Sequence, residues 1–250
     1  MLYEDNHIAV VVKPQGMPVF SVKSSHSIEK SYENSTAGYN LHSVLVYNLD
    51  FDTKGSGYRN LHRPRPVHRL DKSTGGCIVA AKTFDALQQM SSMLAGSNSR
   101  SVTKEYRALV FGDLRGNGTI DYLIDKKTAI THYESLFTNH TQLFGPITTL
   151  RILIETGRKH QIRKHLAMIG HPIIGDKRYI FSSYYFQSFK TPSFHYLFPE
   201  NMVQIHEFPH IFLWSVAIKF EHPIVKEKII DVRLEEPDIF KEFRAYYCIK

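Results

Sequence analysis

The segment His68-Arg69-Leu70-Asp71-Lys72-Ser73-Thr74-Gly75-Gly76 leads from a charged turn into the apolar run Cys77–Ala81, which is typical of a buried strand. Within it, Asp71 lies between two cations, Arg69 and Lys72. Neighbouring positive charge favours the ionised form of a carboxyl group. An ionised aspartate on a tight turn can act as a nucleophile if a cleft shields it from water. A solvent-exposed turn with an ion pair would have the same composition, so this segment alone leaves both interpretations open.

The composition bounds the class of protein. A chain of 250 residues with 42% hydrophobic and 22% charged residues is long enough to bury a core, and we expect a single domain because no linker is evident. The net charge of +7, with 14 histidines, favours a polyanionic partner such as nucleic acid. The two cysteines, Cys77 and Cys248, are too few for a disulfide framework or a cysteine-based zinc site, which indicates a reducing compartment.

Signals for membranes and secretion are missing from this sequence. It has no run of about 18 apolar residues and no secretory signal, so we expect no membrane partner. We expect an intracellular location, cytoplasmic or else nuclear or organellar, and a monomer.

The apolar pattern predicts an α+β fold with a mixed, largely antiparallel central sheet flanked by helices and loops, because strands outnumber helices without regular βαβ units. The expected strands are Ile8–Val12, Cys77–Ala81, Glu105–Phe111, Thr148–Thr156 and Phe212–Phe220. The expected helices are Leu41–Leu49, Phe84–Leu94 and Gln161–Ile169. Loops are expected at 21–40 and Asp50–Pro66, and a hairpin-type turn at Gly116-Asn117-Gly118.

An aromatic-rich segment at about 177–210 stands apart from the rest of the chain. Its many Tyr and Phe residues lie among Lys177, Arg178 and Lys190, and such rings can stack on unpaired bases. They can equally pack an insertion onto the body of the protein, and we favour packing because large aromatic side chains mainly form cores.

A second basic cluster, Thr156–His165, lies where a strand is expected to give way to a helix. The amides at a helix N-terminus add positive potential there, so the cluster suits a phosphate or a carboxylate. His160 and His165 are five positions apart and have no acidic neighbour, a pattern that argues against zinc. We therefore expect no metal site and no cofactor.

With both clusters in view, the chain resembles the RluA-type pseudouridine synthases. The motifs that carry the resemblance are Tyr3-Glu4-Asp5, Lys13-Pro14-Gln15-Gly16, His68–Asp71, Lys104-Glu105-Tyr106, Ala129-Ile130-Thr131-His132-Tyr133, Thr156–His165 and the spaced set Gly170, Pro172, Gly175, Asp176 and Tyr179. The chain departs from the family pattern at Ser73, Gly75 and Leu213-Trp214-Ser215, and its aromatic insertion is longer than usual. The N-terminal RNA-binding domain of many members is not expected here.

The resemblance implies an RNA uridine isomerase that acts on ribosomal or transfer RNA by flipping out a base. It assigns catalytic roles to Asp71, Tyr106 and Arg163. Asp71 would be the reacting carboxylate, Arg163 would hold it charged and aimed, and Tyr106 would pack against the uracil and accept the C5 proton. Attack at C1′, attack at C6 and elimination to a glycal remain open for Asp71.

The resemblance also implies residues that bind the RNA. Arg69 would fill the gap that the flipped base leaves in the base stack, and Ile162 would form an apolar wall of the pocket that excludes water. The remaining candidates for contacts with substrate or phosphate are His68, Lys13, Arg65, Arg158 and Lys159.

Two other functions would use part of the same pattern. A base-excising glycosylase would also place a carboxylate at C1′, but it would want a second carboxyl group, and neither cluster has one besides Asp71. A non-catalytic RNA-binding module would explain the positive charge but not an aspartate inside the basic turn.

Overall fold

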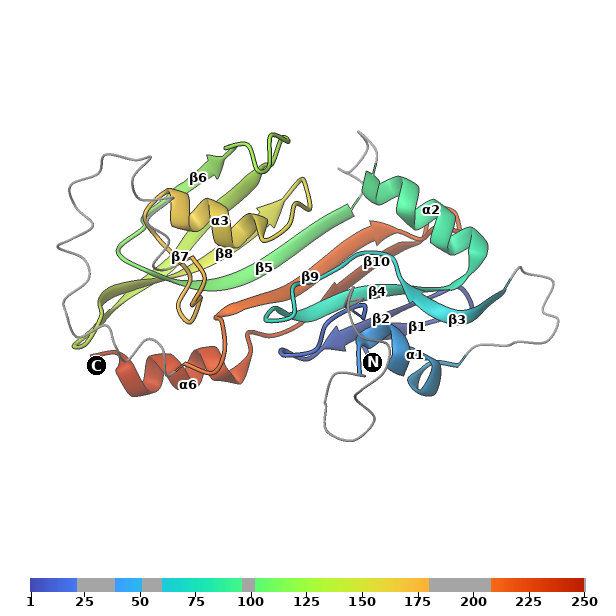
Figure 1. Ribbon diagram of the computed structural model, residues 1–250, viewed down its shortest axis with the longest axis horizontal. Helices are drawn as coiled ribbons and strands as arrows, with labels where there is room; N and C mark the ends of the chain where they lie inside the picture. The colour runs from blue at the N-terminus through green and yellow to red at the C-terminus, as the bar shows by residue number, and fades with distance from the viewer. Residues whose placement is uncertain (22–38, 51–59, 96–101, 180–207, 250) are drawn as a thin grey trace, which may run out of the picture. The chain divides into compact units, whose positions relative to one another are not determined.

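The computed structural model describes residues 1–21, 39–50, 60–95, 102–179 and 208–249, and Figure 1 traces them in chain order. They form two compact units. Unit 1 comprises Met1–Val102 and Phe220–Val232, and unit 2 comprises Thr103–Lys219 and Arg233–Lys250. Most of the predicted aromatic segment, residues 180–207, lies outside the described residues. No helix in the described ranges has the length and apolar character needed to cross a bilayer.

The sheet of unit 1 is built on two buried strands. Strand β2 (Ile8–Lys13) pairs antiparallel with β4 (Gly75–Thr83), in a register that sets Lys13 opposite Gly76. Every residue of β4 is buried, as expected for the apolar run after the Asp71 turn. Strands β1 (Tyr3–Glu4) and β3 (Asn60–Pro66) pair with β2 and β4, and β10 (Ile229–Arg233) follows the turn after β9.

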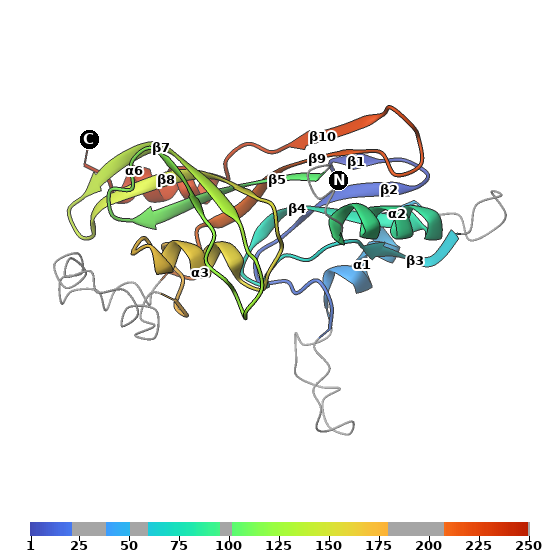
Figure 2. The ribbon, with the colours of Figure 1, turned by 90° about the horizontal axis from the view of Figure 1, so that it is seen from above.

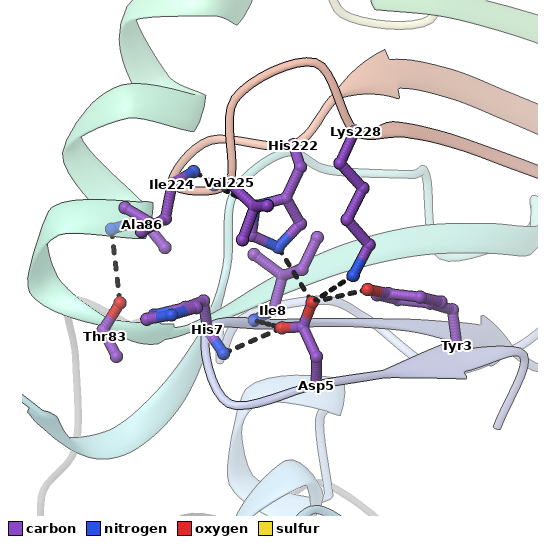
Figure 3. Close-up of polar contacts among 10 residues, drawn as sticks. All are labelled: Tyr3, Asp5, His7, Ile8, Thr83, Ala86, His222, Ile224, Val225 and Lys228. Carbon is purple, nitrogen blue, oxygen red and sulfur yellow. Dashed lines mark hydrogen bonds and ion pairs between the residues drawn. The ribbon is translucent and has the colours of Figure 1, made fainter. Parts of the chain in front are cut away.

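Two helices accompany these strands, close to their predicted bounds. Helix α1 (Leu41–Asn48) begins with a reciprocal cap in which the Asn40 side chain accepts the Ser43 amide at 3.0 Å, and it packs against β3. Helix α2 (Phe84–Ala95) starts directly after β4 and packs against it. There, Thr83 Oγ1 accepts the Ala86 amide (Figure 3).

The prediction of a loop over Asp50–Pro66 is wrong for its second half, which forms β3. Pro64 and Pro66 weaken the strand signal because proline has no N–H for a ladder. Among the described strands β3 pairs with β4 alone, with an irregular register between Asn60 and Arg65, and an edge strand of this kind tolerates proline.

A polar cluster around Asp5 joins the turn after β1 to the turn before β10 (Figure 3). The Asp5 carboxylate accepts bonds from Tyr3 Oη, from the amides of His7 and Ile8 and from His222 Nε2 at 2.8 Å. Lys228 adds an ion pair at 3.6 Å. Burial alone raises the pKa of Asp5, but these bonds outweigh it and hold that pKa far below its usual value.

The neighbours of His222 fix its tautomer. Its Nδ1 accepts the amides of Ile224 and Val225, so the ring proton is on Nε2 and is donated to Asp5. Burial lowers the pKa of His222, with Asp5 opposing the shift. The neutral ring is therefore the form that fits this turn.

Unit 2 contains an antiparallel sheet in the order β9-β5-β8-β7-β6. Its strands are β5 (Val102–Phe111), β6 (Asn117–Ile120), β7 (Thr131–Thr141), β8 (Gly145–Ile154) and β9 (Leu213–Glu221). Helix α3 (Gln161–Met168) lies against β7 (Figure 2). Helix α6 (Asp238–Tyr247) contributes to a cluster of aromatic rings, Phe144, Phe208, Phe212, Phe240, Phe243 and Tyr247.

The α+β class and the predicted strands and helices are confirmed, and one predicted turn is wrong. Of the triplet Gly116-Asn117-Gly118, only Gly116, with φ of 76°, lies outside the sheet. Asn117 already begins β6, which pairs with β7 by setting Asn117 opposite Glu134. A Gly-Asn-Gly triplet is compatible with either structure, and pairing with β7, a strand that the periodicity did not reveal, decides between them.

We predict that Asp5→Asn lowers the free energy of unfolding by about 2 kcal/mol at pH 7, because the bonds to a charged acceptor are lost.

The same cluster predicts how the stability of the unsubstituted protein depends on pH. His222 has a lowered pKa in the folded protein, so the free energy of unfolding falls as the pH drops below about 6.5. The contribution of Asp5 is complete above about pH 4 and is lost as the pH falls towards its lowered folded pKa. Urea unfolding at pH 7, 5.5, 4 and 2.5 measures both effects, the first three values for His222 and the last for Asp5.

Asp50→Asn is the control, because Asp50 is an exposed carboxylate of the same unit. Equal stabilities of the two variants at pH 7 would contradict the importance of the Asp5 cluster.

Candidate active site

The Asp71 turn in unit 1 is held by backbone hydrogen bonds at both sides. The Thr74 amide donates to the Asp71 carbonyl at 3.1 Å, and the Gly16 amide donates to the Lys72 carbonyl at 2.8 Å. Leu70, 6% exposed, anchors the turn in the core just before the carboxylate. The half-buried Asp71 thus lies on a short connection that the buried strand β4 fixes from one end.

A buried ammonium group crosses beneath this turn. Lys13 has 0% exposure, and its Nζ donates to the carbonyls of Pro14 at 2.9 Å, Met17 at 2.8 Å and Lys72 at 3.4 Å. Burial lowers the pKa of Lys13 to about 8, and the negative charge of Asp71 opposes that shift. This geometry does not support the prediction of a phosphate contact for Lys13, because its ammonium is enclosed by carbonyls. Lys13 instead braces the turn and supplies a positive charge that acts on Asp71.

Three other residues of unit 1 were predicted to contact the RNA. One of them is hydrogen-bonded to the sheet, and the other two are exposed. His68 Nε2 accepts the amide of Val79 in β4 at 3.1 Å, so this nitrogen carries no proton. Arg65 and Arg69 are exposed. The exposed Arg63 and Arg65 place positive charge on β3, and burial together with these two charges lowers the pKa of His42. The surface of β3 and the Asp71 turn can therefore attract an anion.

In unit 2, Tyr106 occupies a fixed place in strand β5. It is 5% exposed and lies opposite Ile152 of β8. The adjacent Glu105 faces the other side of the sheet, where it pairs with Arg151 at 3.1 Å. The alternation of the strand thus separates an ion-pair face from the face that presents the tyrosine.

The junction between β8 and α3 is organised by the amide of Gln161. Its Oε1 accepts bonds from Thr156 Oγ1 at 2.7 Å and from the Arg158 amide at 3.0 Å. Its Nε2 donates to the Ile130 carbonyl at 2.9 Å and to Thr131 Oγ1 at 3.0 Å. All four hydrogen-bonding positions of one buried side chain therefore join the 129–133 segment to the basic cluster.

The two histidines of this cluster make different structural contacts. His165 Nε2 contacts the Tyr122 carbonyl and its Nδ1 contacts Thr131 Oγ1, both at 3.0 Å, and burial lowers its pKa. His160, in the left-handed region with φ of 55°, bonds Tyr179 Oη at 2.7 Å. Among the described residues no group of three or more His, Cys, Asp or Glu could hold a metal ion.

Arg163 is buried, whereas Arg158 and Lys159 are exposed. Arg163 forms a two-pronged ion pair with Asp176, from Nε to Oδ2 at 2.7 Å and from Nη2 to Oδ1 at 2.8 Å. Arg158 keeps one tie to the protein, from Nε to the Thr128 carbonyl at 2.9 Å. The exposed cations are available to a polyanion, while Arg163 acts inside the protein.

Sequence reasoning named Ile162 as a dry wall, and its 6% exposure fits an apolar position. It missed the enclosure of Lys13 and the pairing of Arg163 with Asp176. Asp176 was identified only as a motif position, and nothing in its spacing from Arg163 predicts contact, since the chain turns back between them.

Comparisons with known proteins agree with the resemblance in the sequence. A family model described as RNA pseudouridylate synthase matches residues 7–168. The ribosomal large subunit pseudouridine synthase D of Pseudomonas aeruginosa is 32% identical over 238 residues, covering 89% of this chain and 64% of that protein. An uncharacterized RNA pseudouridine synthase of Aquifex aeolicus is 31% identical and covers 98% of this chain and 72% of that protein.

Solved structures share the fold. The human RNA pseudouridylate synthase domain containing 1 has a TM-score of 0.64 with 18% identity, covering 100% of this chain and 96% of that one. The human RNA pseudouridylate synthase domain containing 4 has the same TM-score with 20% identity, covering 98% of this chain and 91% of that one. The chain spans 64% and 65% of the Pseudomonas aeruginosa and Vibrio cholerae synthases D that it matches.

We predict that Lys13→Met lowers the free energy of unfolding by about 3 kcal/mol at pH 7, because the buried carbonyls around the ammonium lose their donor. Lys72→Met is the matched control, since the Lys72 side chain is exposed and only its backbone carbonyl joins the network. We expect the control to lie within about 0.5 kcal/mol of the unsubstituted protein. Similar urea midpoints for both variants would show that Lys13 does not brace the turn.

Proposed function

The chain belongs to the RNA pseudouridylate synthase family, and on this premise we propose that it isomerises uridine to pseudouridine in a structured RNA, ribosomal or transfer. The observation that carries the proposal is Asp71, which lies on a turn held by backbone bonds, with the buried ammonium of Lys13 donating to the carbonyl of the next residue. The names of the synthase D relatives favour ribosomal RNA as the first substrate to test.

The reaction sets modest chemical requirements. The N1–C1′ bond of the nucleotide breaks, the uracil turns, and a C5–C1′ bond forms. The C5 proton departs and N1 gains a proton, so the product is an isomer of the substrate. No redox partner or group donor enters this balance, and the protein has to supply a carboxylate, a base for the C5 proton and a pocket for the extruded base.

In the proposed mechanism Asp71 is the catalytic carboxylate, by attack at C1′ or C6 or by assisting elimination to a glycal. Arg163 pairs with it and keeps it charged and aimed. Asp71 belongs to unit 1 and Arg163 to unit 2, and the proposed reaction requires both side chains. Tyr106 packs against the uracil ring and accepts the C5 proton directly or through water. Its burial on a strand supports a fixed position for such a contact.

The exposed cations have roles in holding the RNA. Arg69 enters the stack that the uridine leaves, while Arg65, Arg158 and Lys159 contact phosphates. Their exposure supports these assignments, since a polyanion can reach them without rearrangement of the core. Ile162 shields the extruded base from water.

Two other activities are separated from this one by their products. The test incubates the protein with an unmodified transcript of large-subunit ribosomal RNA. A pseudouridine synthase forms pseudouridine at unchanged mass, detected by carbodiimide labelling and reverse transcription. A glycosylase releases free uracil, and a non-catalytic RNA-binding module does neither. Free uracil, or no pseudouridine on this transcript and on total RNA, would overturn the proposal.

We predict that Asp71→Asn abolishes pseudouridine formation and leaves RNA affinity within about threefold of the unsubstituted protein. The amide is nearly isosteric with the carboxylate but is not a nucleophile, and phosphate contacts dominate affinity. Single-turnover assays and filter binding on the same transcript measure the two quantities. Turnover by the purified variant would remove Asp71 from the catalytic role.

A second prediction concerns base extrusion. Arg69→Ala should slow modification of a stem-loop far more than that of a short flexible strand, because unstacking a base costs a few kcal/mol only in a helix. Lys126→Ala, which removes another exposed cation, should affect both RNAs alike. Equal losses on both RNAs for Arg69→Ala would mean that Arg69 acts on the chemistry instead.

A further inference from the structure

Asp176 is the partner of Arg163 in unit 2, and the pair is almost completely enclosed. The side chain of Asp176 is 1% exposed and that of Arg163 is 10% exposed. Both carboxylate oxygens are used, with Nε to Oδ2 at 2.7 Å and Nη2 to Oδ1 at 2.8 Å. A two-pronged contact of this kind fixes the plane of the guanidinium as well as its distance.

The carboxylate is itself held by the backbone that carries it. Asp176 Oδ1 also accepts the amides of Arg178 at 3.1 Å and Tyr179 at 3.3 Å. The preceding Gly175 has φ of 79°, and a Cβ at that position would lie 2.0 Å from the carbonyl oxygen of His210. Only glycine fits there, because the left-handed backbone and the close approach of His210 leave no room for a side chain.

A second contact holds the face of the same guanidinium. The Cζ of Arg163 lies 5.0 Å from the centre of the Tyr179 ring, within the range of a cation–π contact. The Tyr179 hydroxyl in turn bonds His160 Nδ1 at 2.7 Å. Asp176 therefore fixes the edge of the guanidinium that contains Nε, while Tyr179 limits tilt of its plane.

Asp176 engages only two of the five N–H donors of the guanidinium, namely Nε–H and one Nη2–H. Because the group is planar and rigid, fixing this edge also sets the direction of the Nη1 donors. The neighbouring residue on α3 provides a contrast, since Lys164 pairs with the exposed Asp125 at a longer 3.4 Å. Adjacent positions of one helix thus carry a tightly oriented cation and a loosely paired one.

We propose that Asp176 is a positioning residue of the isomerisation, which fixes the guanidinium of Arg163 in the orientation that the reaction uses. The inference rests on the proposed function, in which Arg163 belongs to the catalytic set. The contacts of the Asp176 carboxylate are with Arg163 and with backbone amides, so no contact with the substrate is assigned to it. Its effect passes through Arg163, which sets it apart from a residue that only stabilises the fold.

The test is a double-mutant cycle on the unmodified transcript of large-subunit ribosomal RNA. The enzymes are the unsubstituted protein, Asp176→Asn, Arg163→Met and the double variant. We expect Asp176→Asn to slow the single-turnover rate by about 100-fold, the scale of a 1 Å misplacement, and to change the RNA dissociation constant by less than about threefold. Because Asp176 acts through Arg163, the double variant should be no slower than Arg163→Met alone.

Asp125→Asn is the matched control, because it removes the partner of the next residue on α3, and its rate should equal that of the unsubstituted protein. If circular dichroism shows that Asp176→Asn does not fold, Asp176→Glu is used instead. This variant keeps the negative charge but displaces it by one methylene group. A rate equal to the control, or losses that multiply in the double variant, overturns the inference. Absence of pseudouridine with the unsubstituted protein, on this transcript and on total RNA, overturns the proposed function itself.

Discussion

The enclosed ammonium of Lys13 is the interaction on which the geometry of the Asp71 turn depends. Lys13 is the last residue of strand β2 and lies opposite Gly76 of β4. Its ammonium group donates to the carbonyl of Lys72, the residue after Asp71. A buried cation without partners would be costly, so the surrounding carbonyls and the nearby carboxylate have to keep their places for the charge to be tolerated. The same requirement that stabilises the cation therefore restrains the residue proposed for the chemistry.

Unit 2 applies the same principle with different groups. Gln161 has all its hydrogen-bonding positions satisfied, and the Arg163–Asp176 pair satisfies both carboxylate oxygens. Such networks stabilise only when they are complete, because a partly satisfied buried group carries its full desolvation cost. This explains why the motif positions require particular side chains, such as an amide at 161, that hydrophobic residues of equal size could not replace.

The strands and helices with regular apolar periodicity could be predicted from the sequence, since burial on one face leaves a local pattern. Strand β3 could not, because its prolines obscure the pattern and its place at the edge of the sheet is a tertiary property. For the site, resemblance supplied the residues, but the contact of Lys13 with Lys72 joins distant parts of the chain, and that of Arg163 with Asp176 depends on how the chain turns back after α3. No spacing rule predicts such contacts, so the sequence alone could not reveal that the ammonium of Lys13, a candidate for a phosphate contact, is enclosed by carbonyls.

The complete burial of β4 has a consequence for redox chemistry. Cys77 begins the apolar run after the Asp71 turn, and burial raises the pKa of its thiol to about 12. At neutral pH the group is a thiol, whereas oxidants and alkylating agents react with the thiolate. The strand that fixes the Asp71 turn thus carries a sulfur atom whose burial and protonation both disfavour reaction with peroxide and electrophiles.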